Sequence, residues 1–213
     1  MSDDFTSLYP SYDVLQKWDT TSWNDVTRDV VSKRLNEVPQ RRFFSETQYD
    51  TLVAVCHRVM PQPEREQPVP IAPWLDAKVY EGQGTGTRYA SLPPEQECWR
   101  RGLDAIEAEA QLRYRRAFAA LDRVEQDIAL RAIEKGEVEA PAWEGFDAKS
   151  FMRHVLFREI VGIYYAHPAA WSEIGFGGPA SPRGYVRLAE NRRDPWEAVE
   201  HAPAAAQELA PTS

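Results

Sequence analysis

The sequence predicts an all-α fold: a compact bundle of five to six helices with long, ordered loops rich in proline, glycine and aromatic residues. Apolar residues recur at steps of three and four in several segments, and no segment alternates as a half-buried strand does. Capping residues precede these segments, and proline or glycine follows them. The chain has 213 residues, 43% of them hydrophobic, which is enough for one domain with a substantial core.

The two ends of the chain differ from its middle. Residues 1–21 hold four aromatic anchors, and we expect them to form an extended arm. These anchors are Phe5, Tyr9, Tyr12 and Trp18. Residues 22–200 form the predicted helical domain. Residues 201–213, HAPAAAQELAPTS, are of low complexity, and we expect a disordered tail.

Two helices are predicted before residue 61. Ser22 offers an N-cap with Asp25 three residues later, and Pro39 ends the first helix. Its expected apolar side consists of Trp23, Val26, Val30, Val31, Leu35 and Val38. The second helix has a clearer capping box, Ser45 with Gln48, and stops at Pro61. Its expected apolar side consists of Tyr49, Leu52, Val53, Val55, Cys56 and Val59.

The segment 61–73 contains five prolines, so we expect a stiff connector that is neither helix nor central strand. A short helix is predicted from Trp74 to Glu81. The sequence GQGTGT at 82–87 then reads as a plain loop. It lacks the preceding strand and the GxGxxG or Lys-Ser/Thr pattern of a phosphate cradle.

The longest predicted helix runs from Glu95 to Arg116. Its core stripe is Trp99, Leu103, Ile106, Ala110 and Tyr114, and its solvated face is Arg100, Arg101, Glu107, Arg113 and Arg115. Asp122 with Glu125 begins another helix, and Gly136 stands where a left-handed C-terminal residue is needed. The apolar side expected for this helix is Val124, Ile128, Ala129, Ala132 and Ile133.

The stretch 151–185 organises the chain. A helix capped by Asp147 carries apolar residues most of the way round, which predicts burial in the domain centre or between subunits. A loop dense in glycine and proline follows and contains Tyr164, Tyr165, Trp171, Phe176 and Tyr185. Proline restricts the backbone and aromatic rings need a surface, so we expect an ordered loop. Packing against its own domain and packing against a partner both remain open.

Composition excludes several classes of protein. A net charge of −8 and a pI near 5.1 argue against binding nucleic acid or an anionic membrane surface, and no apolar run is long enough to span a membrane. Cys56 and Cys98 form no disulfide framework or zinc quartet, and we expect two buried thiols in separate helices. Arg41-Arg42-Phe43-Phe44 imitates a twin-arginine signal, but an interrupted apolar segment follows it. As it stands, the chain is expected to be cytoplasmic unless a partner exports it.

Few residues suggest catalysis. The four histidines are His57, His154, His167 and His201, and none has a second histidine at metal-binding spacing. His154 is expected to be a core or interface residue. His167 beside Glu173 is the candidate general base, although a loop histidine next to proline is more often a hydrogen-bonding strut.

Three segments occur in a suggestive order: RRFFSETQYDTLVAVCHRVMP from Arg41, FAALDRVEQ from Phe118, and YYAHPAAWSEIGFGGPASPRGY from Tyr164. In their order and spacing they resemble the gluconate 2-dehydrogenase subunit 3 family over about residues 41–188. The members are small subunits of FAD-dependent sugar and polyol dehydrogenases. Many of them begin with a twin-arginine signal, whereas this chain has an extension of about forty residues there.

The resemblance implies a non-catalytic subunit with no catalytic, cofactor-binding or metal-binding residue of its own. A large flavoprotein of the glucose-methanol-choline type would hold FAD and oxidise a sugar, glycoside or polyol hydroxyl. A cytochrome c or another acceptor would take the electrons. The small subunit would support folding, stability or export of its partner, and the complex would be periplasmic if exported.

We expect the partner interface to combine the aromatic loop, its preceding helix and the N-terminal arm. Its predicted residues are Tyr164, Tyr165, His167, Trp171, Ile174, Phe176, Tyr185, Tyr9, Tyr12 and Trp18. Two alternatives remain: a free-standing enzyme that uses His167 and Glu173, and a general chaperone or adaptor.

Overall fold

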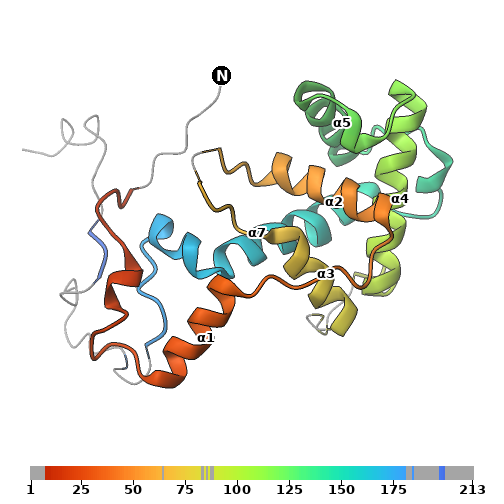
Figure 1. Cartoon of the computed structure of the whole chain (residues 1–213). Helices are drawn as coiled ribbons and strands as arrows, with labels where there is room; N and C mark the ends of the chain where they lie inside the picture. The colour runs from red at the N-terminus through yellow and green to blue at the C-terminus, as the bar shows by residue number, and fades with distance from the viewer. Residues whose placement is uncertain are drawn as a thin grey trace, which may run out of the picture. The chain divides into compact units, whose positions relative to one another are not determined.

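A computed structural model describes residues 8–63, 65–82, 84, 86, 89–180, 184 and 197–199. Within these residues the regular elements are all helices, which confirms the all-α prediction (Figure 1). The described residues form seven α-helices, one more than the upper limit of the five to six predicted from the sequence. The extra one arises because a π-helical turn divides the predicted helix after Asp147. Phe5, Tyr185 and the predicted tail lie outside the described residues.

The chain divides into two compact units. Unit 1 comprises Met1–Glu37 and Tyr165–Ser213, and unit 2 comprises Val38–Tyr164. The described part of the predicted arm therefore belongs to the same unit as the first helix and the aromatic loop.

Unit 2 is built around α2 and α4. Its elements are α2 (Glu46–Val59), α3 (Ile71–Glu81), α4 (Glu95–Tyr114), η2 (Phe118–Ala120), α5 (Arg123–Lys135), η3 (Pro141–Trp143), α6 (Ala148–Phe151), the π-helical turn η4 (Met152–Leu156) and most of α7 (Phe157–Ala166). α2 packs against α3, α4, η2 and α5, and α4 also contacts η3, α5 and α6 (Figure 1). The capping boxes of Ser45 with Gln48 and Asp122 with Glu125 are present as predicted.

An aromatic cluster fills the core of unit 2. Phe151 is fully buried, and its ring centroid lies 5.9 Å from that of Trp99, 6.4 Å from that of Trp143 and 5.4 Å from that of Phe146. The ring approaches α4 at Gly102, where no side chain intervenes. The predicted α4 stripe is confirmed for Trp99 and for Leu103, Ile106 and Ala110, which are all buried.

Unit 1 joins segments that are far apart in sequence. It contains η1 (Val14–Lys17), α1 (Asp25–Asn36), η5 (Pro168–Ile174) and the end of α7. η5 contacts both α1 and η1. The described part of the predicted extended arm therefore contains a helical turn and packs against the C-terminal loop.

Several sequence predictions were wrong in detail. α1 is capped by Asn24, whose side chain accepts a hydrogen bond from the Thr27 N–H, and Ser22 precedes the cap. α3 begins at Ile71, three residues before the predicted start, because Pro73 is tolerated in a first helical turn. α4 ends at Tyr114, where Arg115 adopts a left-handed conformation with φ of 58°.

The predicted apolar sides of α1 and α5 were also partly wrong. Val26 and Val30 on α1 are 72% and 48% exposed, and Val38 beyond the helix is 56% exposed. On α5, Val124 and Ile128 are 67% and 51% exposed. The buried side of α5 instead includes Leu130 and Gln126, because the neighbouring helices select a stripe rotated from the expected one.

The face of α4 that was predicted to be exposed to solvent is only partly exposed. Arg100 and Arg115 are exposed, but the Glu107 carboxylate accepts hydrogen bonds from the Thr51 hydroxyl and the Phe118 N–H. Glu109, also on α4, is completely buried. It pairs with Arg113 at 2.6 Å and accepts backbone N–H bonds from residues 139 and 140. Buried charges are rare in proteins unless they are paired in this way.

Candidate functional site

The aromatic residues around η5 form a small core inside unit 1. Trp171 is buried with Val14, Trp23 and Val31, and four partly buried apolar residues surround this group: Tyr12, Leu15, Trp18 and Leu35. Trp171 also meets Phe176 edge to face, with ring centroids 5.4 Å apart. The loop is therefore ordered by packing within its own unit.

Hydrogen bonds fix the loop to η1. The Val14 N–H donates to the Ser172 hydroxyl at 3.1 Å. The Lys17 ammonium is buried and donates to the Tyr12 hydroxyl at 2.9 Å and to the Gly177 carbonyl at 3.1 Å. A buried ammonium is costly unless polar partners replace its water, so these contacts hold the two segments together.

Two glycines allow this close approach. A Cβ at Gly175 would lie 2.6 Å from the Tyr9 ring, and one at Gly178 would lie 2.9 Å from the Trp23 ring. Both glycines have positive φ, 65° and 72°, a conformation that side-chain-bearing residues rarely adopt. The Gly-rich segment thus packs closely against these two rings and does not have the character of a flexible linker.

The predicted interface residues differ in how much surface they expose. Tyr164 belongs to unit 2, where it is buried and its hydroxyl accepts a hydrogen bond from Arg65 at 3.3 Å. Trp171 and His167 are buried in unit 1, whereas Tyr165 and the arm residues Tyr9, Tyr12 and Trp18 are half-buried. Ile174 and Phe176 are exposed, by 44% and 38%. In unit 1 these two offer the clearest apolar contacts among the predicted interface residues.

His167 acts as a structural residue in this arrangement. It caps η5, and its Nδ1 accepts a hydrogen bond from the Ala169 N–H at 3.3 Å. Because Nδ1 is engaged, it is unavailable as a general base. The pKa of the Tyr165 phenol is raised, mainly by burial and also by the negative charge of Glu173, so this phenol stays protonated at neutral pH.

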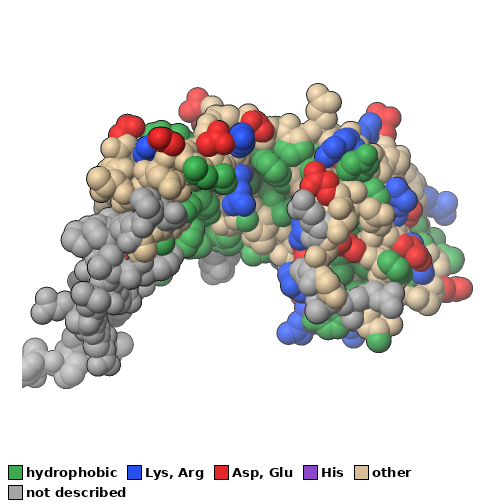
Figure 2. Space-filling model, turned by 90° about the horizontal axis from the view of Figure 1, so that it is seen from below, with side chains coloured by type: hydrophobic (Ala, Val, Ile, Leu, Met, Phe, Trp, Pro, Cys, Tyr) green, Lys and Arg blue, Asp and Glu red, His purple; other side chains and the backbone are tan. Residues whose placement is uncertain are grey.

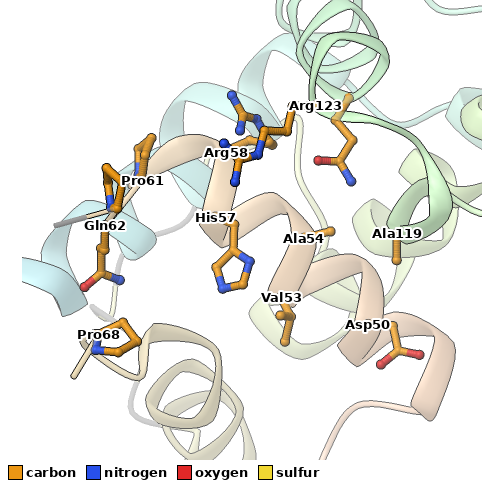
Figure 3. Close-up of a pocket in the computed structure, with 12 residues that line it drawn as sticks. Asp50, Val53, Ala54, His57, Arg58, Pro61, Gln62, Pro68, Ala119 and Arg123 are labelled. Carbon is orange, nitrogen blue, oxygen red and sulfur yellow. The ribbon is translucent and has the colours of Figure 1, made fainter. Parts of the chain in front are cut away.

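Unit 2 contains an open cavity of about 570 Å³ beside α2. Its walls come from α2, the proline-rich connector, η2 and α5, and the His57 imidazole points into the space near Gln62 and Pro68 (Figure 3). Arg58 at its edge is held by two bonds to the Asp127 carboxylate, at 2.7 and 2.9 Å. The described lining residues include no serine, threonine or cysteine, so this cavity presents no hydroxyl or thiol nucleophile.

The described residues contain no group of three or more His, Cys, Asp or Glu side chains placed to hold a metal ion. Cys56 on α2 and Cys98 on α4 are free and buried, as predicted. Burial raises the pKa of both thiols, that of Cys98 to about 12, so neither is a reactive thiolate at neutral pH. Of the described helices, none is both long and apolar enough to cross a membrane.

Sequence reasoning missed a completely buried carboxylate in unit 2. Asp76 on α3 is completely buried, and its carboxylate accepts hydrogen bonds from the N–H groups of Arg42, Phe43 and Phe44 at 2.6 to 3.2 Å. The twin-arginine-like segment is therefore anchored in the fold through its backbone. A single aspartate in the middle of a largely apolar helix was the signal available in the sequence.

A family model described as gluconate 2-dehydrogenase subunit 3 matches residues 46–178. The chain belongs to this family. The match runs from the start of α2 into the aromatic loop and lies within the range 41–188 predicted from the sequence. No curated protein and no solved structure matches the chain. The family's description names one subunit of a dehydrogenase, which implies a hetero-oligomeric complex.

Proposed function

We propose that this member of the subunit 3 family is the non-catalytic small subunit of an FAD-dependent dehydrogenase complex. In this proposal a large subunit of the glucose-methanol-choline type oxidises a sugar, glycoside or polyol hydroxyl, and a cytochrome c or another acceptor takes the electrons. The family match across residues 46–178 is the observation that supports the proposal most directly.

We assign the flavin to the partner, and the surroundings of the glycine-rich segment of this chain support that assignment. A dinucleotide cradle requires a strand, a glycine-rich turn and a helix that begins at the phosphates. Here the Gly82–Gly86 region follows α3, and Gly82 is a left-handed residue that ends this helix. The buried thiols and the capping role of His167 likewise favour a supporting role over catalysis.

In the proposed complex the small subunit stabilises the large one and assists its folding or export. Asp76 fixes the backbone of Arg42, Phe43 and Phe44 within unit 2, which argues against the use of this segment as a twin-arginine signal, so in this proposal any export depends on the partner. The complex would then be periplasmic when the partner is exported and cytoplasmic otherwise.

The partner is expected to contact unit 1 at the exposed end of the aromatic loop. Ile174 and Phe176 are exposed next to the buried Trp171, so the loop presents apolar side chains on a rigid base. Hydrophobic side chains reach the surface at several places among charged ones (Figure 2). Rigid apolar contacts are effective at interfaces because little conformational entropy is lost on binding. A specific interface buries about 800 Å² on each partner, so further residues of unit 1 must contribute.

The test is co-purification of the tagged chain from its native host. We expect a second protein of flavoprotein size with flavin absorbance bands. A colourless monomer would contradict the subunit role, and a mixture of many unrelated proteins would favour a general chaperone. Turnover by the isolated chain that disappears in His167→Ala would instead favour the free-standing enzyme.

A matched pair of double variants locates the interface. Ile174→Ser with Phe176→Ser removes exposed apolar groups from unit 1, and we expect the flavoprotein to be lost. Val124→Ser with Ile128→Ser removes a comparable exposed pair from α5 in unit 2, and we expect the flavoprotein to be retained. Equal retention by both variants would refute the assignment to the loop and leave the subunit role standing.

A further inference from the structure

The buried face of η5 is covered by residues 8–37, which we call the N-terminal segment. The family match covers residues 46–178, so it includes η5 and excludes the N-terminal segment. Trp171 on η5 is buried, and the buried apolar residues that pack with it all belong to the N-terminal segment: Val14, Trp23 and Val31. The matched region therefore contains a surface whose cover comes from outside that region.

The contacts between the N-terminal segment and the η5 region extend from η1 to the last turn of α1. The hydrogen bond from the Val14 N–H to the Ser172 hydroxyl fixes one end. At the other end the Arg34 guanidinium donates to the Ala166 carbonyl at 3.3 Å. Apolar anchors thus lie between two polar ones, which is the pattern of an amphipathic helix that binds in a groove.

Contacts within the N-terminal segment join η1 to α1. The Arg28 guanidinium on α1 donates to the carbonyls of Trp18 and Trp23, at 3.1 and 2.7 Å. The rings of these two tryptophans meet edge to face, with centroids 5.8 Å apart. Because of these contacts, we expect η1 and α1 to bind and release η5 together.

The attachment of the N-terminal segment to η5 is small. Among the described residues, their shared core contains four buried apolar side chains, and regions with few buried apolar contacts open at a low free-energy cost. α1 has 12 residues, a length at which an isolated helix is marginal, so its stability depends on η5. Residues 37–41 form no helix, and Glu37, Val38 and Gln40 among them are exposed. An exposed linker of this kind lets the segment leave η5 without unfolding of unit 2.

We propose that the η5 face is a docking site for an amphipathic helix with a tryptophan anchor, and that the N-terminal segment is its reversible, intramolecular occupant. When the segment leaves, unit 2 stays folded and the face presents the Trp171 ring and the Ser172 hydroxyl. The face recognises the pattern that the segment supplies, Trp23 with Val31 about two helical turns later. This inference is independent of the proposed complex, because the face and its occupant both belong to this chain.

Native-state hydrogen exchange of the full chain tests whether the segment detaches. The amides of Val14 and α1 should exchange together, about a hundredfold faster than the buried amides of α4, because their opening does not require global unfolding. Their exchange should also depend less on added urea, because local opening exposes less surface. Equal rates and equal urea dependence in α1 and α4 would show that the segment opens only when the whole chain unfolds, and would overturn the proposal.

A synthetic peptide of residues 8–37 tests whether the face is a docking site. The peptide carries a fluorophore, and its anisotropy is followed as full-length chain is added. Val31→Ser in the chain weakens the internal occupant, because Val31 is 1% exposed, whereas Val30→Ser is the matched control at a position that is 48% exposed. We expect the Val31→Ser chain to bind the peptide about tenfold more tightly than the wild-type chain, because its site is open more often. The Val30→Ser chain should bind it as the wild-type chain does.

The same substitutions in the peptide should have the opposite effect. The Val31→Ser peptide should bind the Val31→Ser chain about tenfold more weakly than the wild-type peptide, and the Val30→Ser peptide should bind it equally well. Absence of saturable binding to the Val31→Ser chain, or equal binding of the two variant peptides, would overturn the proposal. Loss of α4 amide protection in the Val31→Ser chain would also overturn it, because the segment would then be inseparable from unit 2. Both assays use this chain alone, so their outcome is distinct from that of co-purification with the flavoprotein.

Discussion

Replacing Gly102 with alanine tests the packing of the unit 2 core directly. Gly102 is buried within α4, and a Cβ there would lie 2.1 Å from Cζ of Phe151 and within 2.5 Å of two further ring carbons. Favourable contacts between carbon atoms lie at about 3.5–4.0 Å, so the ring would have to move by about 1.4 Å. Phe151 is fully buried among three aromatic side chains, so it has no open space to enter.

Two opposing effects determine the size of the change. Alanine favours the helix over glycine by about 1 kcal/mol. Overpacking a well-packed core costs about 1–3 kcal/mol, and the enclosed ring of Phe151 argues for the upper end of this range. We therefore expect Gly102→Ala to lower the free energy of unfolding by about 2 kcal/mol, that is, roughly 3 minus 1.

Urea denaturation followed by circular dichroism measures this difference, and Gly162 provides the matched control. Gly162 lies in α7 and is exposed, and a Cβ added to it would meet no atom within 4 Å outside its own helix backbone and chain neighbours. Gly162→Ala should therefore stabilise the chain by about 0.5–1 kcal/mol. Adding Phe151→Leu to Gly102→Ala should cost less than the sum of the single changes. Stabilisation by Gly102→Ala equal to that by Gly162→Ala would refute the contact between Gly102 and Phe151.

Three further predictions use the same denaturation assay. Asp76→Asn should cost about 2–4 kcal/mol, because an amide cannot accept all the backbone N–H bonds that the carboxylate accepts, and an unchanged midpoint would contradict the anchoring role. Asp147→Ala should cost about 1 kcal/mol near neutral pH through loss of the N-cap. Hydrogen bonds from Ser150 lower the pKa of Asp147 below its ordinary 3.8. The stabilisation by this cap is therefore complete above pH 3.8 and is lost as the pH falls through the lowered pKa. If Asp147→Ala still destabilised the chain in stronger acid, the ionised carboxylate would not be the source of the stabilisation. Val124→Lys should change the free energy of unfolding by less than about 0.5 kcal/mol, because Val124 is 67% exposed. A large loss of stability would indicate that Val124 is a core residue after all.

Two capping boxes and one C-terminal glycine were predicted correctly from the sequence. The boxes formed by Ser45 with Gln48 and by Asp122 with Glu125 were predicted and are present, and Gly136 adopts the left-handed conformation expected of it, with φ of 73°. These features depend on residues three or four positions apart, so the local sequence contains the necessary information. The cap of α1 was misassigned because two suitable residues, Ser22 and Asn24, stand close together.

The direction of each apolar stripe was harder to predict. Val26 and Val30, like Val124 and Ile128, recur at helical spacing but face solvent. Periodicity shows that a helix has an apolar side, whereas the neighbouring elements decide which side is covered. Lys17 shows the reverse case: lysine is normally exposed, yet its partner, the Gly177 carbonyl, is 160 residues away and could not be identified from local sequence.

The aromatic loop shows why the number of rings does not measure a binding surface. Its rings predicted either a partner or a core, and Trp171 proves to be a core residue of its own unit, where Val14, Trp23 and Val31 cover it. The surface available for a partner consists of what this packing leaves exposed. In unit 1 the exposed apolar residues include Leu8, Val26, Val30, Ile174 and Phe176. The α1 valines that were wrongly assigned to the core are thus exposed in the same unit as Ile174 and Phe176. The buried Trp171 ring, which meets Phe176 edge to face, would hold Phe176 in position before a partner arrives, and this lowers the entropic cost of association.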